Sequence, residues 1–385
     1  METTSFPPGA PPPLMPPPVI APQPPPPPRK SRGWMIFAIV LLILLAFSWF
    51  IYFSIFARAL TFKSGFGPGF TTSAMRTAAP RLDEYVTQDN HSRNKIAVIT
   101  VNGIITSHSK DPDGNSMVDI IKAQLDRASD DHNVRAVILK VDSPGGEVMA
   151  SDQINKLIVR FQKISSKPVI CSMGSLAASG GYYISAPCRW IVADDLTLTG
   201  SIGVIMEGLN YRGLMDKIGL QPMVYKSGKY KDMLSGMRET NDIPAGEHEM
   251  VQNLIDETFQ KFKAVVRTGR TAAHEENEKA NMGGRALATD WESVADGRVL
   301  SGEQALKYGF VDEIGGFDTA TDKAMKLAGI RNANIVEYRQ RHDLSDFLSL
   351  FGESSKAHDI KLDLGIEAPK LQAGERYFLW LPPAD

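Results

Sequence analysis

Residues 134–146 read VRAVILKVDSPGG, an apolar run that ends in a turn built from proline and two glycines. A near-continuous apolar run of this length indicates a strand buried on both faces, which is typical of a parallel sheet covered by helices. Gly145 and Gly146 permit a tight turn and leave backbone N–H groups accessible to a ligand. Taken alone, the turn is equally compatible with an ordinary connection between a strand and a helix.

Segments of the same kind lie on both sides of this run. Short apolar strands are predicted at IAVITV (96–101), VIC (169–171) and WIVA (190–193), and PMVY (222–225) is strand-like. Apolar residues at helical spacing predict helices over 118–128 and 154–164, and a long helix from about Glu247 to Val266. The alternation of strands and helices predicts a layered α/β domain with mostly parallel pairing.

The amino-terminal region has a different composition. Residues 1–33 form a proline-rich tail, which we interpret as an extended spacer; a docking peptide for a proline-binding module is the alternative. Residues 34–56 carry no charge and are long enough for a transmembrane helix, with a cleaved signal peptide as the competing interpretation. Basic residues precede this span, which predicts a cytoplasmic amino terminus and an extracytoplasmic carboxyl-terminal domain. A linker and lead-in segment (57–93), the α/β domain (94–335) and a carboxyl-terminal extension (336–385) complete the predicted organisation.

Composition excludes several functional classes. The formal net charge is -2, so no nucleic-acid partner is expected. The two cysteines, Cys171 and Cys188, match no zinc or redox pattern; they can form a bridge or, as we favour, remain buried thiols. Glutamates stand beside His248 and His274, but HExxH is absent, which argues against a zinc peptidase.

Ser179 is the candidate nucleophile. It lies in GSLAASGGYY (174–183), where small neighbours leave its hydroxyl open and the glycines after it favour the start of a helix. Backbone donors at such a position stabilise developing negative charge, although a serine helix cap is an equally good interpretation of this segment alone.

A serine nucleophile needs a base. The seven histidines lie in polar segments, which disfavours a Ser-His-Asp triad without excluding it. Lysine is the other option, and Lys226, Lys229 and Lys231 compete for the role within one short segment. A lysine acts as a base only when desolvation lowers its pKa from about 10.4 toward about 7–8, which requires a substantially buried site.

Five segments together resemble one known family: VDSPGGEV (141–148), GSLAASGGYYIS (174–185), LTGSIGVIME (198–207), KSGKYKDMLS (226–235) and ADGRVLSGEQALKYGFVDEIGG (295–316). Their order and spacing are similar to those of the short form of the signal peptide peptidase A family of membrane-bound Ser/Lys peptidases. The resemblance implies a crotonase-like (ClpP-like) superhelical α/β domain. It implies Ser179 as nucleophile, Lys231 as base and Ser201 as the residue that hydrogen-bonds the lysine. An oxyanion hole would use the Gly180 N–H and an N–H from Gly145-Gly146.

The resemblance also implies substrates and partners. These are hydrophobic peptides such as signal-peptide remnants, cleaved at the cell (inner) membrane by a homo-oligomeric ring whose grooves are shaped partly by neighbouring protomers; no metal or organic cofactor is expected. The apolar segment 376–381 fits an edge strand, an oligomer contact or a flap over the groove. Two other functions are a catalytically silent membrane scaffold that recruits partners through the proline tail, and acyl-CoA chemistry on the related crotonase architecture.

Overall fold

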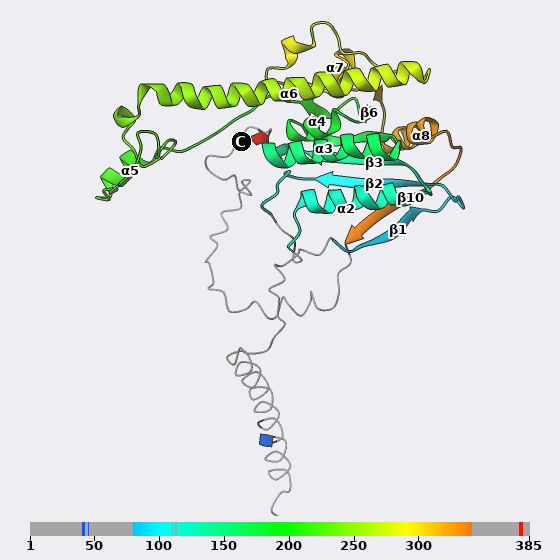
Figure 1. The fold of residues 1–385 in the computed structure, drawn as a ribbon, viewed down its shortest axis with the longest axis horizontal. Coiled ribbons are helices and arrows are strands. Elements are labelled where there is room, and N and C mark those ends of the chain that lie inside the picture. The colour runs from blue at the N-terminus through cyan, green and yellow to red at the C-terminus, as the bar shows by residue number, and fades with distance from the viewer. Residues whose placement is uncertain are drawn as a thin grey trace, which may run out of the picture. The chain divides into compact units, whose positions relative to one another are not determined.

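A computed structural model describes residues 41–42, 45, 80–109, 111, 114–340 and 377–379 (Figure 1). The chain divides into two units, Met1–Ala74 and Met75–Asp385. Only three residues of the first unit are described, and all three are helical: Leu41, Leu42 and Leu45. No helix among the described residues has both the length and the apolar composition needed to cross a membrane. The proline-rich tail and nearly all of the predicted transmembrane helix lie outside the described residues.

The second unit is a mixed α/β fold built on one twisted sheet. Along the sheet the strands follow the order β1-β10-β2-β3-β5-β6-β9, and β7 branches off between β5 and β8. Pairing is parallel from β10 to β9, which confirms the predicted parallel core, while β1 and β8 pair antiparallel. The strands are β1 (Leu82–Gln88), β2 (Lys95–Asn102), β3 (Val134–Ser143), β5 (Val169–Ala178), β6 (Trp190–Ala193), β7 (Leu198–Gly200), β8 (Val299–Ser301), β9 (Glu313–Ile314) and β10 (Asn334–Gln340).

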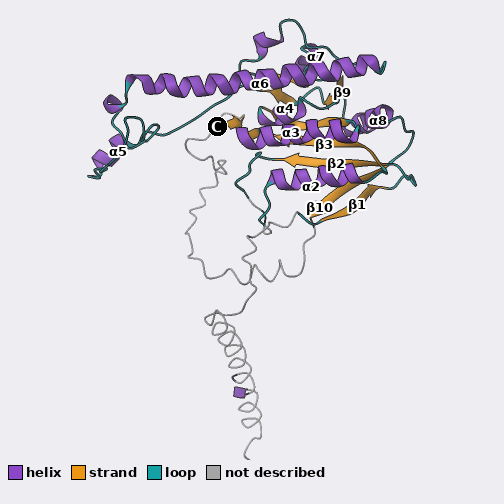
Figure 2. Ribbon diagram, viewed as in Figure 1, coloured by secondary structure: helices purple, strands orange, loops and turns teal. Residues whose placement is uncertain are grey.

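Helices cover both faces of this sheet, as Figure 2 shows. Side chains alternate along each strand, so β2 places Ile99 and Val101 in one core and Ile96 and Val98 in the other. The first core packs against α2, α3, α4 and α6, and the second against α8. The helices are α2 (Met117–Asp130), α3 (Val148–Ser165), α4 (Gly180–Ser185), α5 (Arg212–Lys217), α6 (Ala245–Lys279), α7 (Gly302–Lys307) and α8 (Phe317–Leu327).

A second, two-stranded sheet lies at the carboxyl end of β3. Its strands are β4 (Gly145–Glu147) and β11 (Tyr377–Leu379), which pair antiparallel with Phe378 opposite Gly146. The glycines of the SPGG turn therefore belong to a short strand, β4, between β3 and α3. Strand β11, from near the carboxyl terminus, lies along one edge of β4.

Two sequence predictions about local structure need correction. PMVY (222–225) is not a strand, because Met223, Val224 and Tyr225 are exposed and no neighbouring strand pairs with them. Helix α6 does not end near Val266 but continues to Lys279. Its buried positions past that point include Arg270 and Asn277, whose polar side chains hide the apolar periodicity.

Candidate active site

Ser179 occupies the junction between β5 and α4. It is the residue before the first turn of α4, as the glycines after it predict, and its backbone has φ 53° and ψ -115°. Positive φ is costly for a residue with a side chain, so the surrounding structure must hold this conformation. Gly181 explains how: a Cβ there would lie 2.8 Å from the Ser143 carbonyl oxygen, so α4 packs directly on the end of β3.

Ser201 lies beside Ser179. The Ser179 N–H donates to the Gly200 carbonyl at 2.9 Å, and β5 pairs with β7 so that Ala178 lies opposite Gly200. Ser201 also has positive φ, 49°, and its N–H donates to the Arg298 carbonyl at 2.8 Å. The fold thus brings together two serines that stand 22 positions apart in the sequence, and both are buried.

The two glycines of the turn differ in what their N–H groups can do. The Gly145 N–H donates to Ser143 Oγ at 3.1 Å. The segment at Ile105 bonds to one edge of β4 through the Gly145 carbonyl and the Glu147 N–H. Since successive residues of a strand direct their backbone groups to opposite edges, the Gly146 N–H points to the other edge, where β11 pairs. Of the two glycines predicted to form the oxyanion hole, Gly145 therefore has its N–H engaged by Ser143, and Gly146 faces the edge at which β11 pairs.

Lys231 is held on an arm formed by residues 205–244 and the start of α6. Its N–H donates to the Gly228 carbonyl at 3.2 Å, and its side chain is exposed. Two contacts tie its loop to the first turn of α6: the Leu234 N–H donates to Glu247 Oε1 at 3.0 Å, and Arg238 forms a buried ion pair with Glu247. The buried lysine environment that the sequence predicts is therefore not formed within one chain.

The two other candidate lysines are already engaged. Lys226 Nζ lies 2.9 Å from both carboxylate oxygens of Asp232, and Lys229 Nζ lies 5.1 Å from the centre of the Tyr230 ring. Within the described part of the chain, Lys231 makes no comparable contact.

The length of α6 separates Lys231 from Ser179 within one chain. The Tyr183 and Phe262 rings pack edge to face with centroids 5.0 Å apart, so α6 meets α4 at Phe262. From the first turn of α6 at Glu247 to Phe262 the helix rises about 22 Å. That is several times the reach of a lysine side chain. Figure 1 shows this end of α6, with α5 near it, extending beyond the sheet.

The arm exposes many apolar side chains. They include several that are more than half exposed: Leu209 at 86%, Leu214 at 61%, Ile218 at 61%, Met223 at 79% and Tyr225 at 88%. Large exposed apolar surfaces on a folded domain are typical of interaction sites.

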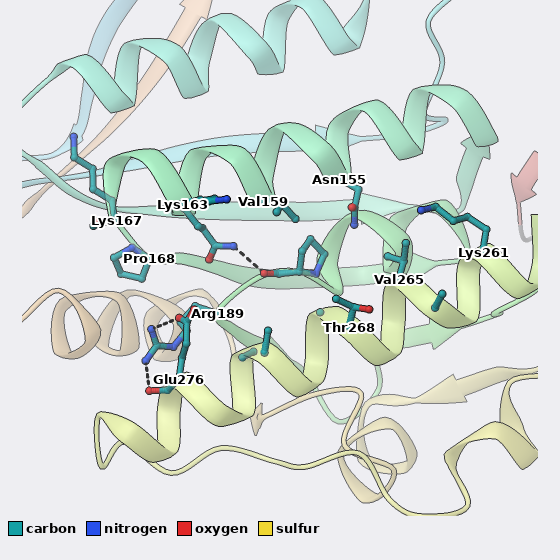
Figure 3. Close-up of a pocket in the computed structure, with 17 residues that line it drawn as sticks. Asn155, Val159, Lys163, Lys167, Pro168, Arg189, Lys261, Val265, Thr268 and Glu276 are labelled. Carbon is teal, nitrogen blue, oxygen red and sulfur yellow. Dashed lines mark hydrogen bonds and ion pairs between the residues drawn. The ribbon is translucent and has the colours of Figure 1, made fainter.

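A cavity of about 770 Å³ lies elsewhere, between α3 and α6 (Figure 3). Its lining includes the ion pair between Arg189 and Glu276, whose atoms are 2.7 Å apart, and Lys163 and Lys261 from the two helices. Neither Ser179 nor Ser201 lines this cavity, and neither do the turn residues Gly145 and Gly146. The candidate catalytic groups instead lie near β4, on the side where β11 pairs with it.

Sequence reasoning missed Glu147, the residue directly after Gly146. Its carboxylate is buried and accepts hydrogen bonds from Thr106, Ser107 and His108. Its place next to the turn was the only available signal, since nothing in the spacing of residues 106–108 connects them with position 147.

Comparison with known proteins gives a consistent result. The model of peptidase family S49 matches residues 161–331, a range that includes Ser179, Ser201 and Lys231. "Putative signal peptide peptidase SppA" of Enterococcus faecium is 34% identical over 276 residues, which cover 70% of this chain and 73% of the relative. "Protease 4" of Haemophilus influenzae is 34% identical over 306 residues, 76% of this chain and 46% of the relative. "Serine protease SPPA, chloroplastic" of Arabidopsis thaliana is 33% identical over 270 residues, which cover 68% of this chain and 37% of the relative.

Proposed function

Since the chain belongs to peptidase family S49 and is a serine peptidase of the signal peptide peptidase A type, we propose that it cleaves hydrophobic peptides with a Ser179/Lys231 dyad completed between protomers. The domain has the crotonase-like fold in this proposal. The observation that carries it is the meeting of Ser179, Ser201 and the Gly146 edge at one end of the sheet, with Lys231 on an exposed apolar arm.

The reaction is acyl transfer. Lys231 removes the Ser179 proton, and Ser179 Oγ attacks the scissile carbonyl. The N–H groups of Gly146 and Gly180 stabilise the oxyanion. Protonated Lys231 then gives its proton to the leaving amine, and water, deprotonated by Lys231, hydrolyses the acyl-enzyme. Ser201 holds the lysine amine in place through a hydrogen bond.

The lysine comes from a second copy of the chain. One chain cannot bring Lys231 to its own Ser179, because about 22 Å of helix separates their anchoring points. The arm that carries Lys231 also exposes the apolar side chains that need a partner. Docking the arm on a neighbour covers these side chains and desolvates Lys231, which favours the neutral amine that a base requires. Repetition of this head-to-tail contact closes a ring.

In this proposal the peptide takes the place of β11 along β4. A segment of the chain itself, β11, pairs there antiparallel, which supports recognition of an extended backbone by strand addition. Hydrophobic remnants of signal peptides fit the proposal, since residues 34–56 would anchor the enzyme where such peptides partition. In this arrangement the amino terminus is cytoplasmic and the catalytic domain lies outside the cell (inner) membrane.

The direct test uses the full-length chain in detergent, an apolar fluorogenic peptide and a fluorophosphonate probe. The wild-type protein is expected to cleave the peptide and to be labelled. Ser179→Ala is expected to lose labelling and about 10⁴-fold or more of kcat, because the nucleophile is gone. Ser175→Ala is the matched control: Ser175 lies four positions before Ser179, within β5, but is exposed, and full activity is expected.

Absence of both cleavage and labelling in the folded, assembled wild type would overturn the proposal. That outcome would favour the scaffold function, and the partner of the proline-rich tail would become the next question. Labelling without cleavage would retain the nucleophile and contradict only the choice of substrate.

A further inference from the structure

Glu147 is a buried charged residue that the mechanism above does not use. Only 6% of it is exposed, and its carboxylate accepts four hydrogen bonds. Oε2 accepts from the Ser107 N–H at 3.0 Å and from Ser107 Oγ at 2.7 Å. Oε1 accepts from Thr106 Oγ1 and lies 2.8 Å from His108 Nδ1. All four partners belong to three consecutive residues.

These contacts fix one segment against the edge of β4. Just before the three residues, the Ile105 N–H donates to the Gly145 carbonyl and the Ile105 carbonyl accepts from the Glu147 N–H, both at 2.8 Å. The approach is so close that a Cβ on Gly146 would lie 2.0 Å from the Ile105 carbonyl oxygen. The backbone and the side chain of Glu147 therefore hold the same segment, on the edge opposite the Gly146 N–H.

The ionisation state of Glu147 matches this role. Burial alone raises the pKa of Glu147, but the hydrogen bonds from Thr106, Ser107 and His108 outweigh burial and leave the pKa lowered. An ionised carboxylate only accepts hydrogen bonds and offers about four lone pairs, one for each donor present. Hydrogen bonds to a charged acceptor are about twice as strong as neutral ones.

We propose that Glu147 is a positioning residue for the oxyanion hole: its carboxylate fixes residues 105–108 against β4 and thereby sets the position of the Gly146 N–H. The inference rests on the proposed function for its catalytic meaning. Gly145 and Gly146 have wide backbone freedom, and a strand of three residues has little pairing of its own. An oxyanion donor is effective only when it is preorganised at the right distance.

The contact between His108 and Glu147 permits a different arrangement, in which Glu147 orients His108 as the base for Ser179. Within the described chain, however, no histidine hydrogen-bonds to Ser179. His108→Ala separates the two arrangements. A positioning network that loses one of four hydrogen bonds should lose about 3-fold in kcat, whereas loss of the base should remove activity as Ser179→Ala does.

The experiment compares Glu147→Gln with Glu313→Gln in the full-length protein. Glutamine preserves the volume of Glu147 but removes its charge and replaces one acceptor oxygen by a donor. Glu313 is the matched control, since it accepts from Trp190 Nε1 at 3.0 Å on β9, outside the catalytic site. We expect Glu147→Gln to lower kcat and the rate of fluorophosphonate labelling about 10- to 100-fold, with KM within about twofold. Glu313→Gln should leave both rates unchanged.

Amide hydrogen exchange tests the positioning role without reference to catalysis. Peptides that cover 103–109 and 145–148 should exchange faster in Glu147→Gln, with no change in the rest of the domain. Ser107→Ala, a milder change, should give the same pattern more weakly. Unchanged exchange in both variants, or a wild-type labelling rate in folded Glu147→Gln, would overturn the inference. Faster exchange in a protein whose wild type neither labels nor cleaves would instead refute the proposed function and leave the positioning role in place.

Discussion

Neither Ser179→Ala nor Lys231→Met is expected to cleave a peptide alone, yet assemblies that contain both chains should recover activity. If each site takes its serine from one protomer and its lysine from the next, random mixing makes about a quarter of the sites complete. Co-expression with two different affinity tags, tandem purification and a peptide-cleavage assay measure this recovery. Labelling by a fluorophosphonate should recover with cleavage, because both need an activated Ser179.

Two controls make the recovery specific. Co-assembly of Ser179→Ala with the double variant Ser179→Ala/Lys231→Met should stay inactive, since no chain supplies the nucleophile. Lys229→Met, a change two positions away on the same loop, should keep wild-type turnover. Inactive mixed assemblies of correct composition would show that Lys231 does not act across the interface, and the single-chain geometry would then leave the base unidentified.

The second large effect concerns stability. Arg270 and Asp312 form an ion pair whose side chains are both fully buried, and it fastens α6 to the loop between α7 and β9. Arg270 Nη1 also donates to the Cys188 carbonyl at 3.0 Å, and Asp312 accepts from the Ile191 N–H at 2.8 Å. Asp312→Ala leaves a buried guanidinium without its counter-charge, and the free energy of unfolding should fall by about 3–5 kcal/mol. Chemical denaturation at fixed protein concentration measures the loss.

An exposed pair serves as the matched control. Arg298 and Asp296 are about half exposed, and solvent screens such pairs, so Asp296→Ala should leave the denaturation midpoint unchanged. The double variant Arg270→Met/Asp312→Leu removes both buried charges together and should recover much of the stability lost in Asp312→Ala. Equal midpoints for Asp312→Ala and Asp296→Ala would mean that the buried pair does not stabilise the fold.

The parallel core of the fold could be predicted from the sequence, because strands that are buried on both faces are apolar along most of their length. Strands β2, β3 and β6 coincide with apolar runs, and Cys171 and Cys188 are free buried thiols, as expected. The same reasoning failed at PMVY, whose residues are apolar but exposed in the single chain. It also predicted too short a helix for α6. Arg270 and Asn277 continue the buried face of this helix with polar side chains, which hydrogen-bond to Asp312 and Arg189.

The candidate site was predictable to different degrees. Ser179 could be placed before a helix from its small neighbours, and Ser201 only from the family resemblance. Their proximity follows from the pairing of β5 with β7, which no local pattern encodes. The relation of Lys231 to Ser179 could not be predicted, because the length of α6 decides it. Glu147 escaped notice because its partners come from a polar segment about 40 positions earlier in the chain.

The 35-residue helix α6 also bears on how such an enzyme is made. If a neighbouring chain supplies the base, as proposed, a newly synthesised chain that folds alone carries a nucleophile without a base and cannot attack nascent proteins that emerge beside it. Under that proposal cleavage begins only after chains have met, so the rate should rise more steeply than in proportion to the concentration of the chain. Dilution by growth or by division would silence the enzyme without any inhibitor. The cell could therefore set proteolysis through the abundance of this one chain.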